Sequence, residues 1–191
     1  NYRKQLKLAA EKLDVPNITL NDIMLYAVSR VLPRHPDLNA HYLGDSIRRF
    51  HHVNLGVAVD TPRGLMVPTL FNADEKSLRE ISSEAKALIA ACQEGSINPD
   101  LLQGGSFTVS NLGSLGIEHF TPVINPPQTG ILGVCGITER VRTGKDGGIS
   151  VYPAMGLSLT YDHRALDGAP ASRFLAELKT ALESFTALLI G

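Results

Sequence analysis

Two strand-forming runs close together in the second half of the chain limit its fold more than any other feature. They are Gly130 to Ile137 and Tyr152 to Thr160, and the polar, glycine-containing stretch 143–148 between them is typical of a β-hairpin. A second pair of runs, Val53 to Val59 and Leu65 to Leu70, flanks another short turn. Strands a turn apart pair antiparallel, so the pattern argues against a doubly wound parallel sheet.

Apolar residues at helical spacing predict four helices interspersed with these strands. Two of them begin with a capping box, formed by Thr19 with Asp22 and by Ser77 with Glu80. The predicted helices cover residues 2–13, Thr19 to Pro33, Ser77 to Gly95, and Pro170 to the C-terminal region. Since helices and strands do not strictly alternate, the sequence predicts an α/β (α+β) fold: a two-layer sandwich in which helices pack on a mixed β-sheet.

Composition and charge exclude several classes of partner. The 191 residues are 43% hydrophobic and 19% charged, which fits one globular domain, and the net charge of -1 offers no field for nucleic acid or an anionic membrane. No apolar run reaches the ~20 residues that span a bilayer. Cys92 and Cys135 lack CxxC spacing and indicate reduced thiols. We therefore expect no nucleic acid, no membrane, and a cytoplasmic or organelle-matrix location.

The chain begins without Met and passes almost directly into a helical run. We therefore expect residues 1–191 to be one domain of a longer protein.

The densest group of reactive side chains is the stretch from Tyr161 to Gly168, between a predicted strand and the last predicted helix. His163 can supply an imidazole as a general base there, and Asp167, four residues on, can fix the turn through Arg164 or through the imidazole itself. Taken alone, the same spacing also fits a surface salt bridge at the start of a helix. The motif by itself leaves both interpretations open.

The stretch 161–168 resembles the DHRxxDG signature of dihydrolipoamide acyltransferases. Three further blocks resemble that family in the same order: 57–65, 105–113 and 122–128. The resemblance extends from about Tyr2 to Ile190, although the family's opening strand and an arginine-containing segment are not in this sequence. The sequence thus resembles the catalytic domain of the E2 component of 2-oxo acid dehydrogenase complexes, which has a chloramphenicol-acetyltransferase-like fold.

This resemblance implies a chemistry for the motif. His163 would take the proton of a coenzyme A thiol, which is mostly protonated at neutral pH, as an acyl group moves between dihydrolipoamide and coenzyme A. Ser110 would donate to the oxyanion that forms. Asp167 would orient the turn, and the family tolerates an amide there. Asp162 and Arg164 would support it.

The resemblance also implies substrates and partners. Coenzyme A is a substrate, with Asn111 as a candidate contact, and the lipoyl group comes from another domain. The upstream lipoyl and subunit-binding domains are expected outside this sequence. The active site would lie between subunits of a homotrimer, with His163 serving alongside Ser110 of a neighbouring chain. The apolar ending 188–190 would dock trimers into a cubic or dodecahedral core of a dehydrogenase complex, or would only complete its own helix face.

Several alternatives stay open at this stage. The block 110–113 and residues 169–171 favour acetyl over succinyl or branched-chain groups. A chloramphenicol-acetyltransferase-like O-acyltransferase would use the same motif, although its usual double histidine is replaced here by Asp162-His163. A third hypothesis is a noncatalytic scaffold domain. The presence of both His163 and Ser110 argues against it. No histidine has partners at zinc-site spacing, so no metal is expected.

Overall fold

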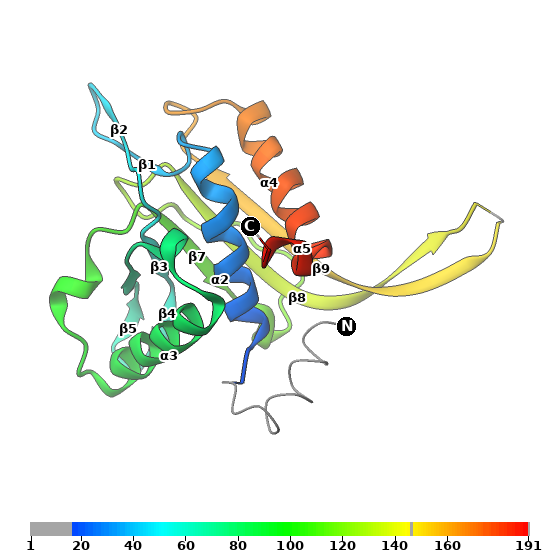
Figure 1. Ribbon diagram of the computed structural model, residues 1–191, viewed down its shortest axis with the longest axis horizontal. Coiled ribbons are helices and arrows are strands. Elements are labelled where there is room, and N and C mark those ends of the chain that lie inside the picture. Colours follow the sequence, from blue (N-terminus) through cyan, green and yellow to red (C-terminus); the bar gives the residue numbers. More distant parts are fainter. Residues whose placement is uncertain (1–16, 146, 191) are drawn as a thin grey trace.

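A five-stranded sheet forms the centre of the protein (Figure 1). The computed structural model describes residues 17–145 and 147–190, so the helix predicted over residues 2–13 lies outside the described residues. The two inner pairs of strands are parallel and the two outer pairs antiparallel. In sheet order the strands are β6 (Thr69–Leu70), β3 (Leu55–Val57), β7 (Phe107–Asn111), β8 (Gly130–Thr143) and β9 (Ile149–Tyr161). The predicted mixed sheet is confirmed.

Helices α2 and α4 lie side by side across one face of this sheet (Figure 1). The capping boxes of α2 and α3 are present as predicted, and Gly95 ends α3 with φ 74°. The α-helices are α2 (Leu20–Val31), α3 (Leu78–Glu94), α4 (Gly168–Glu183) and α5 (Phe185–Leu188). Short 3-10 helices are Leu32–Arg34, Ala73–Glu75, Pro99–Leu102 and Gly113–Leu115.

Each of the predicted strands 53–59 and 65–70 is divided in two. Their outer ends, β3 and β6, pair within the main sheet, while their inner ends form the separate hairpin β4 (Val59–Thr61) and β5 (Gly64–Met66). The division falls at Ala58 and Pro68, and Pro68 has no N–H to continue a ladder. The main sheet therefore contains only the outer part of each predicted strand.

A two-stranded sheet that the sequence did not predict lies next to the main one. It consists of β1 (Ala40–Tyr42) and β2 (Ile47–Arg49), with Tyr42 opposite Ile47. Ala40 accepts a hydrogen bond from the backbone N–H of Thr129, and Tyr42 donates its own N–H to the carbonyl of Pro127. These bonds attach β1 to the segment that leads into β8.

One apolar core joins the helices to the sheet. Phe107 of β7 and Phe174 of α4 are fully buried and meet edge to face, with ring centroids 5.7 Å apart. Gly130, the first residue of β8, lies beside these rings. A Cβ at this position would lie 2.7 Å from Leu38 Cδ2, which favours glycine there. Such close packing holds the first residues of β8 in one place, since interiors at this density leave little room for side chains to shift.

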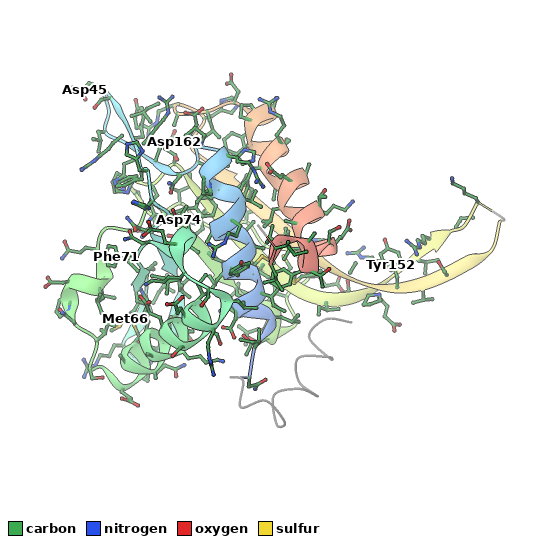
Figure 2. The ribbon with its side chains drawn as sticks, in the orientation of Figure 1. Asp45, Met66, Phe71, Asp74, Tyr152 and Asp162 are labelled. Carbon is green, nitrogen blue, oxygen red and sulfur yellow. The ribbon has the colours of Figure 1, made fainter. Side chains whose placement is uncertain are left out.

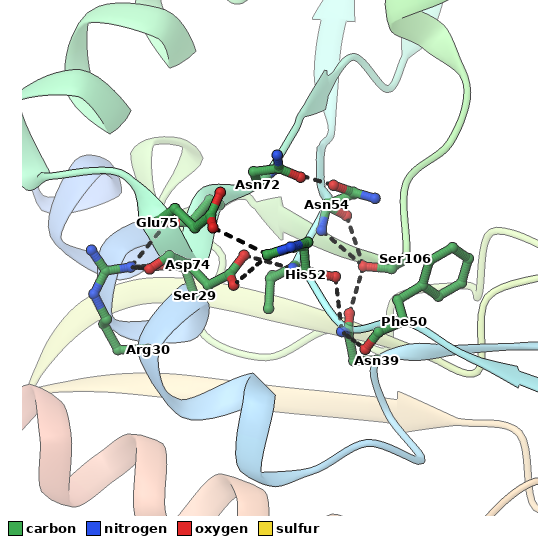
Figure 3. A network of polar contacts seen from close by, with 12 residues as sticks. Ser29, Arg30, Asn39, Phe50, His52, Asn54, Asn72, Asp74, Glu75 and Ser106 are labelled. Atoms are coloured by element: carbon green, nitrogen blue, oxygen red, sulfur yellow. Dashed lines mark hydrogen bonds and ion pairs between the residues drawn. The ribbon is translucent and has the colours of Figure 1, made fainter.

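Polar contacts tie α2 to the chain that precedes α3 (Figure 3). Arg30 donates to the carbonyl of Ala73 at 3.0 Å and to that of Asp74 at 2.6 Å. The Asp74 carboxylate accepts from the backbone N–H of Val53 at 2.7 Å and lies 3.1 Å from His52 Nδ1. His52 is therefore part of a structural network at the start of β3.

Strands β8 and β9 continue beyond the sheet as a two-stranded ribbon that projects from the body (Figure 1). We call residues 137–143 and 149–155 the hairpin arm, and Tyr152 lies on it, away from the helices (Figure 2). The two strands are thus longer than predicted, because the charged residues in 137–143 hide the strand pattern. Its exposed apolar side chains are Ile137, Val141, Ile149 and Val151, which are 56–77% exposed.

Candidate active site

The turn that carries His163 connects β9 to α4, as the sequence predicts. Its first residue, Asp162, donates its backbone N–H to the carbonyl of Thr129 at 2.8 Å and accepts from the N–H of Ala165 at 2.9 Å. At its other end Leu166 is buried in the core. Both ends of the turn are therefore fixed, and His163 stands between them.

The imidazole of His163 faces solvent, with its side chain 69% exposed. Its Nδ1 lies 3.6 Å from Asp167 Oδ1, which is longer than a hydrogen bond, and the Asp167 side chain is 84% exposed. Tyr161 is the aromatic neighbour, with ring centroids 5.5 Å apart. Within one chain, an exposed pair at this distance contributes little stability, so Asp167 guides Nδ1 only loosely.

Asp162 and Arg164 form a closely held ion pair next to His163. Arg164 donates from Nε to Oδ1 at 3.0 Å and from Nη2 to Oδ2 at 2.7 Å, and its backbone N–H also reaches Oδ1 at 3.0 Å. The hydrogen bonds from the Arg164 side chain hold the pKa of the Asp162 carboxyl below its ordinary value of 3.8. The same bonds raise the pKa of the guanidinium. The arginine also lies over Tyr42, with Cζ 4.2 Å from the ring centroid.

The lowered pKa of Asp162 gives a prediction about stability and pH. A carboxyl whose folded-state pKa is depressed stabilises the fold above its unfolded value and loses this effect as pH falls through the folded value. We expect Asp162→Asn to lower the melting temperature by a constant amount above about pH 5, and by progressively less as the pH falls below that range. Thermal unfolding of both proteins across pH measures this. In an Arg164→Met background the difference should largely vanish; its persistence there would contradict the assigned cause.

Ser110 lies within β7, one residue before the strand ends. It is half-buried and sits opposite Gly133 of β8. Among the residues that the structure describes, no group forms a hydrogen bond with its hydroxyl. The hydroxyl is thus free to donate to a bound molecule.

A cavity of about 680 Å³ adjoins Ser110. Asn111 lines the polar side of this cavity. Its side chain is held in place, because its amide donates to Asn21 Oδ1 at 3.0 Å and its side-chain carbonyl oxygen accepts from the N–H of Gly113 at 2.9 Å. The volume lies in the range of small-molecule sites. Other lining residues include Val57, Asp60, Leu65, Cys135 and Met155. Asn21 could not be predicted from the sequence, because it belongs to α2 and lies 90 residues before Asn111.

Ser110 lies on the central strand β7, whereas His163 follows the edge strand β9, so the two residues are well separated within one chain. Ser110 pairs with Gly133, whereas Tyr161, two residues before His163, pairs with Gly130. Three residues along β8 and two strand spacings separate Ser110 from Tyr161, which amounts to about 10 Å in each direction. A single chain therefore does not bring the hydroxyl and the imidazole together.

The apolar ending divides between two surroundings. Leu188 and Leu189 are partly buried and pack against the core, whereas Ile190 is 88% exposed. The first two residues thus complete their own helix face.

Within residues 17–145 and 147–190, no three His, Cys, Asp or Glu side chains are grouped so that they could hold a metal ion. His35 lies 2.6 Å from Glu177, and His41 lies 2.8 Å from the carbonyl of Gly105. No helix in the same described part of the chain is both long and apolar enough for a bilayer crossing.

The mixed sheet and the helices that cover it place the chain in the class of chloramphenicol-acetyltransferase-like folds. A solved chloramphenicol acetyltransferase superposes with a TM-score of 0.59 at 16% identity over 94% of this chain and 82% of the other. Residues 1–190 match the family of 2-oxoacid dehydrogenases acyltransferases (catalytic domain), and the chain belongs to this family.

Individual relatives agree with this assignment. The chain is 40% identical over 173 residues to the dihydrolipoyllysine-residue acetyltransferase component of the Rickettsia bellii pyruvate dehydrogenase complex, covering 91% of this chain and 41% of the relative. It is 40% identical over 189 residues to the corresponding component of the Bacillus subtilis acetoin cleaving system, covering 98% and 47%. The chain thus spans less than half the length of these curated relatives.

A solved structure of Azotobacter vinelandii dihydrolipoamide acetyltransferase superposes with a TM-score of 0.91 at 35% identity over 98% of this chain and 77% of the other. That enzyme was investigated for the roles of a serine, a histidine and an asparagine in its catalytic mechanism, and the asparagine follows the histidine by four positions.

Proposed function

We propose that the chain is a catalytic domain that transfers an acyl group between dihydrolipoamide and coenzyme A, with His163 as the general base. The observation that carries this proposal is the anchored turn, which presents an exposed imidazole in a chain of this family. The catalytic serine and histidine investigated in the Azotobacter relative support the roles of Ser110 and His163. Asp167 stands four positions after His163, where that relative has an asparagine.

The proposed mechanism uses the two ring nitrogens of His163 differently. Nδ1 faces Asp167, which leaves Nε2 to take the proton of the coenzyme A thiol. As the proton leaves, the sulfur attacks the thioester carbon of the acyl-lipoyl group, and its carbonyl oxygen gains negative charge. Ser110 donates a hydrogen bond to that oxygen. Collapse of the intermediate breaks the bond to the lipoyl sulfur, and the imidazolium returns its proton to the departing thiolate.

Asn111 is the proposed contact for coenzyme A. Its side chain borders the cavity next to Ser110 and is held by Asn21 and Gly113. An amide fixed in this way can orient a polar part of a ligand without reacting with it.

The proposed acyl group is acetyl, because the relatives at 36–40% identity are named acetyltransferases. The test is transfer from acetyl, succinyl and branched-chain acyl coenzyme A to free dihydrolipoamide, with chloramphenicol as the competing acceptor. We expect acetyl transfer to dihydrolipoamide to be the fastest. Acylation of chloramphenicol in preference to dihydrolipoamide would overturn the proposal in favour of an O-acyltransferase.

A homotrimer is the proposed functional unit, with His163 of one chain facing Ser110 of the next. Three observations support it. Within one chain the two residues are two strands apart, with Ser110 on β7 and His163 after β9. The hairpin arm exposes apolar side chains, and an isolated two-stranded ribbon is only marginally stable in water, which favours packing of the arm against another chain. One structural relative, at a TM-score of 0.91, forms the cubic core of a pyruvate dehydrogenase complex. The larger cubic or dodecahedral core is proposed on the same ground.

The hairpin arm provides a test of this assembly. We expect Val151→Asp to lower the native mass toward that of a single chain, because it would bury a charge in the interface. Native mass spectrometry of the purified domain measures this. Leu102→Asp is the matched control, since Leu102 is also an exposed apolar side chain but lies in a 3-10 helix away from the arm. An unchanged mass for Val151→Asp would rule out the arm as an interface.

The remaining partners are proposed from the longer relatives. The lipoyl group would be carried by another domain, and the other components of a 2-oxo acid dehydrogenase complex would bind outside residues 1–191. The proposed location is the bacterial cytoplasm or the mitochondrial matrix, the latter because a relative from Caenorhabditis elegans is named as mitochondrial.

A further inference from the structure

The side chain of Arg164 is held from two directions, although it is 68% exposed. Its edge forms two hydrogen bonds with the Asp162 carboxylate, and its face lies 4.2 Å from the centroid of the Tyr42 ring. An exposed ion pair between residues two apart would by itself leave the guanidinium mobile. The aromatic ring adds a third point of attachment, because its face attracts the cation.

Tyr42 is well placed to act as a fixed platform. It is the last residue of β1, where its N–H donates to the carbonyl of Pro127 at 2.8 Å. Two residues further, Thr129 accepts the N–H of Asp162 at its carbonyl and donates its own N–H to Ala40. The same short segment therefore holds both the strand that bears the ring and the turn that bears the arginine.

His163 lies between the two residues of the ion pair in the sequence. Any rotation of the peptide groups around His163 would move Arg164 relative to Asp162. The contacts of Arg164 with Asp162 and Tyr42, which we call the clasp, therefore restrict the backbone that carries the imidazole. Asp167, at 3.6 Å and exposed, restrains the ring only loosely.

We propose that Tyr42 is a positioning residue for His163: its ring holds the Arg164 guanidinium, and the pair of Arg164 with Asp162 fixes the turn that presents the imidazole. This inference rests on the proposed function. The ring acts through Arg164 and does not touch the substrates. If the imidazole spends less time in its reactive position, the rate of proton transfer falls while substrate binding is unchanged.

The kinetic test compares substitutions at Tyr42 in the assembled domain. We expect Tyr42→Leu to lower kcat for acetyl transfer roughly five-fold at an unchanged KM. Tyr42→Phe keeps the ring and should stay within about two-fold of wild type. Arg48→Met is the matched control, because Arg48 lies on the neighbouring strand β2 and its guanidinium packs over Phe50, away from the turn that carries His163. A raised KM in Tyr42→Leu, or an equal loss in Tyr42→Phe, would overturn the proposal.

A double-mutant cycle tests whether Tyr42 acts through Arg164. Arg164→Met alone should lower kcat at least as much as Tyr42→Leu, and the double variant should lose no more than Arg164→Met alone, because residues that share one path are not additive. Two losses that multiply would show that the ring acts independently of the arginine, which contradicts the proposal.

A measurement that needs no reaction separates this inference from the proposed function. In ¹⁵N NMR spectra, the Arg164 Nε–H should give a distinct, slowly exchanging signal in wild type and Tyr42→Phe, and an averaged one in Tyr42→Leu. If wild type transfers no acyl group, the proposed function fails while this signal still tests the clasp. An Arg164 signal that Tyr42→Leu leaves unchanged would overturn the inference even in an active enzyme.

Discussion

We expect His163→Ala to lower kcat for acyl transfer by a factor on the order of 10²–10⁴. The loss is large because a coenzyme A thiol is mostly protonated at neutral pH, and His163 is the one histidine in the stretch 162–167. The exposed side chain fills no space in the core, so the melting temperature should hardly change. Steady-state transfer to dihydrolipoamide and thermal unfolding measure the two quantities.

A second histidine provides the control for this experiment. His119 is also exposed, and its Nε2 lies 3.4 Å from Arg140 Nη2, away from the turn. His119→Ala should transfer acyl groups at the wild-type rate. If His163→Ala assembles normally and keeps the full rate of transfer, His163 is not the base and the domain acts as a scaffold.

Ser110→Ala should lower kcat by a factor on the order of 10²–10³, with little change in KM. The hydroxyl is needed most when the carbonyl oxygen becomes charged, so its loss weakens the transition state more than it weakens substrate binding. Ser96→Ala, an exposed serine after α3, is the matched control. A raised KM with unchanged kcat would mean that Ser110 only binds substrate.

Mixing the two inactive variants tests whether the site is shared. When His163→Ala and Ser110→Ala chains are unfolded and refolded together, about one site in four of a random trimer combines an intact histidine with an intact serine from the next chain. We expect the mixture to recover activity well above either variant. No recovery, with normal trimers formed, would contradict a site between chains.

Local chemistry made part of the fold predictable from the sequence. The capping boxes at Thr19 and Ser77 mark the starts of α2 and α3, because a side-chain oxygen and a carboxylate there satisfy backbone donors that the helix leaves free. The turn 143–148 likewise predicted the hairpin between β8 and β9. These signals lie within a few residues of one another, so they survive without knowledge of the whole chain.

Elements that depend on distant partners were missed. Strand β1 has three residues and no alternating apolar pattern, and it forms because Thr129 and Pro127 bond to it from far along the chain. The outer part of β8 was also missed, because its exposed charges resemble a loop. Short or solvated strands are specified by their neighbours more than by their own residues.

The candidate site shows the same division. The stretch around His163 was recognisable because its residues are contiguous, and they form one anchored turn between β9 and α4. Asn21, the cavity beside Ser110 and the ring of Tyr42 were not found, since each belongs to an element remote in sequence. The roles of Ser110, Asp167, Asp162 and Arg164 stay predictions until the substitutions are made.

The separation of Ser110 from His163 within one chain has a consequence for an unassembled subunit. Under the proposed arrangement, a newly made or highly diluted chain carries half of each of two reaction centres and completes neither. Its specific activity would therefore fall on dilution below the dissociation constant of the oligomer. Acyl thioesters would be protected from wasteful turnover until the chains find one another.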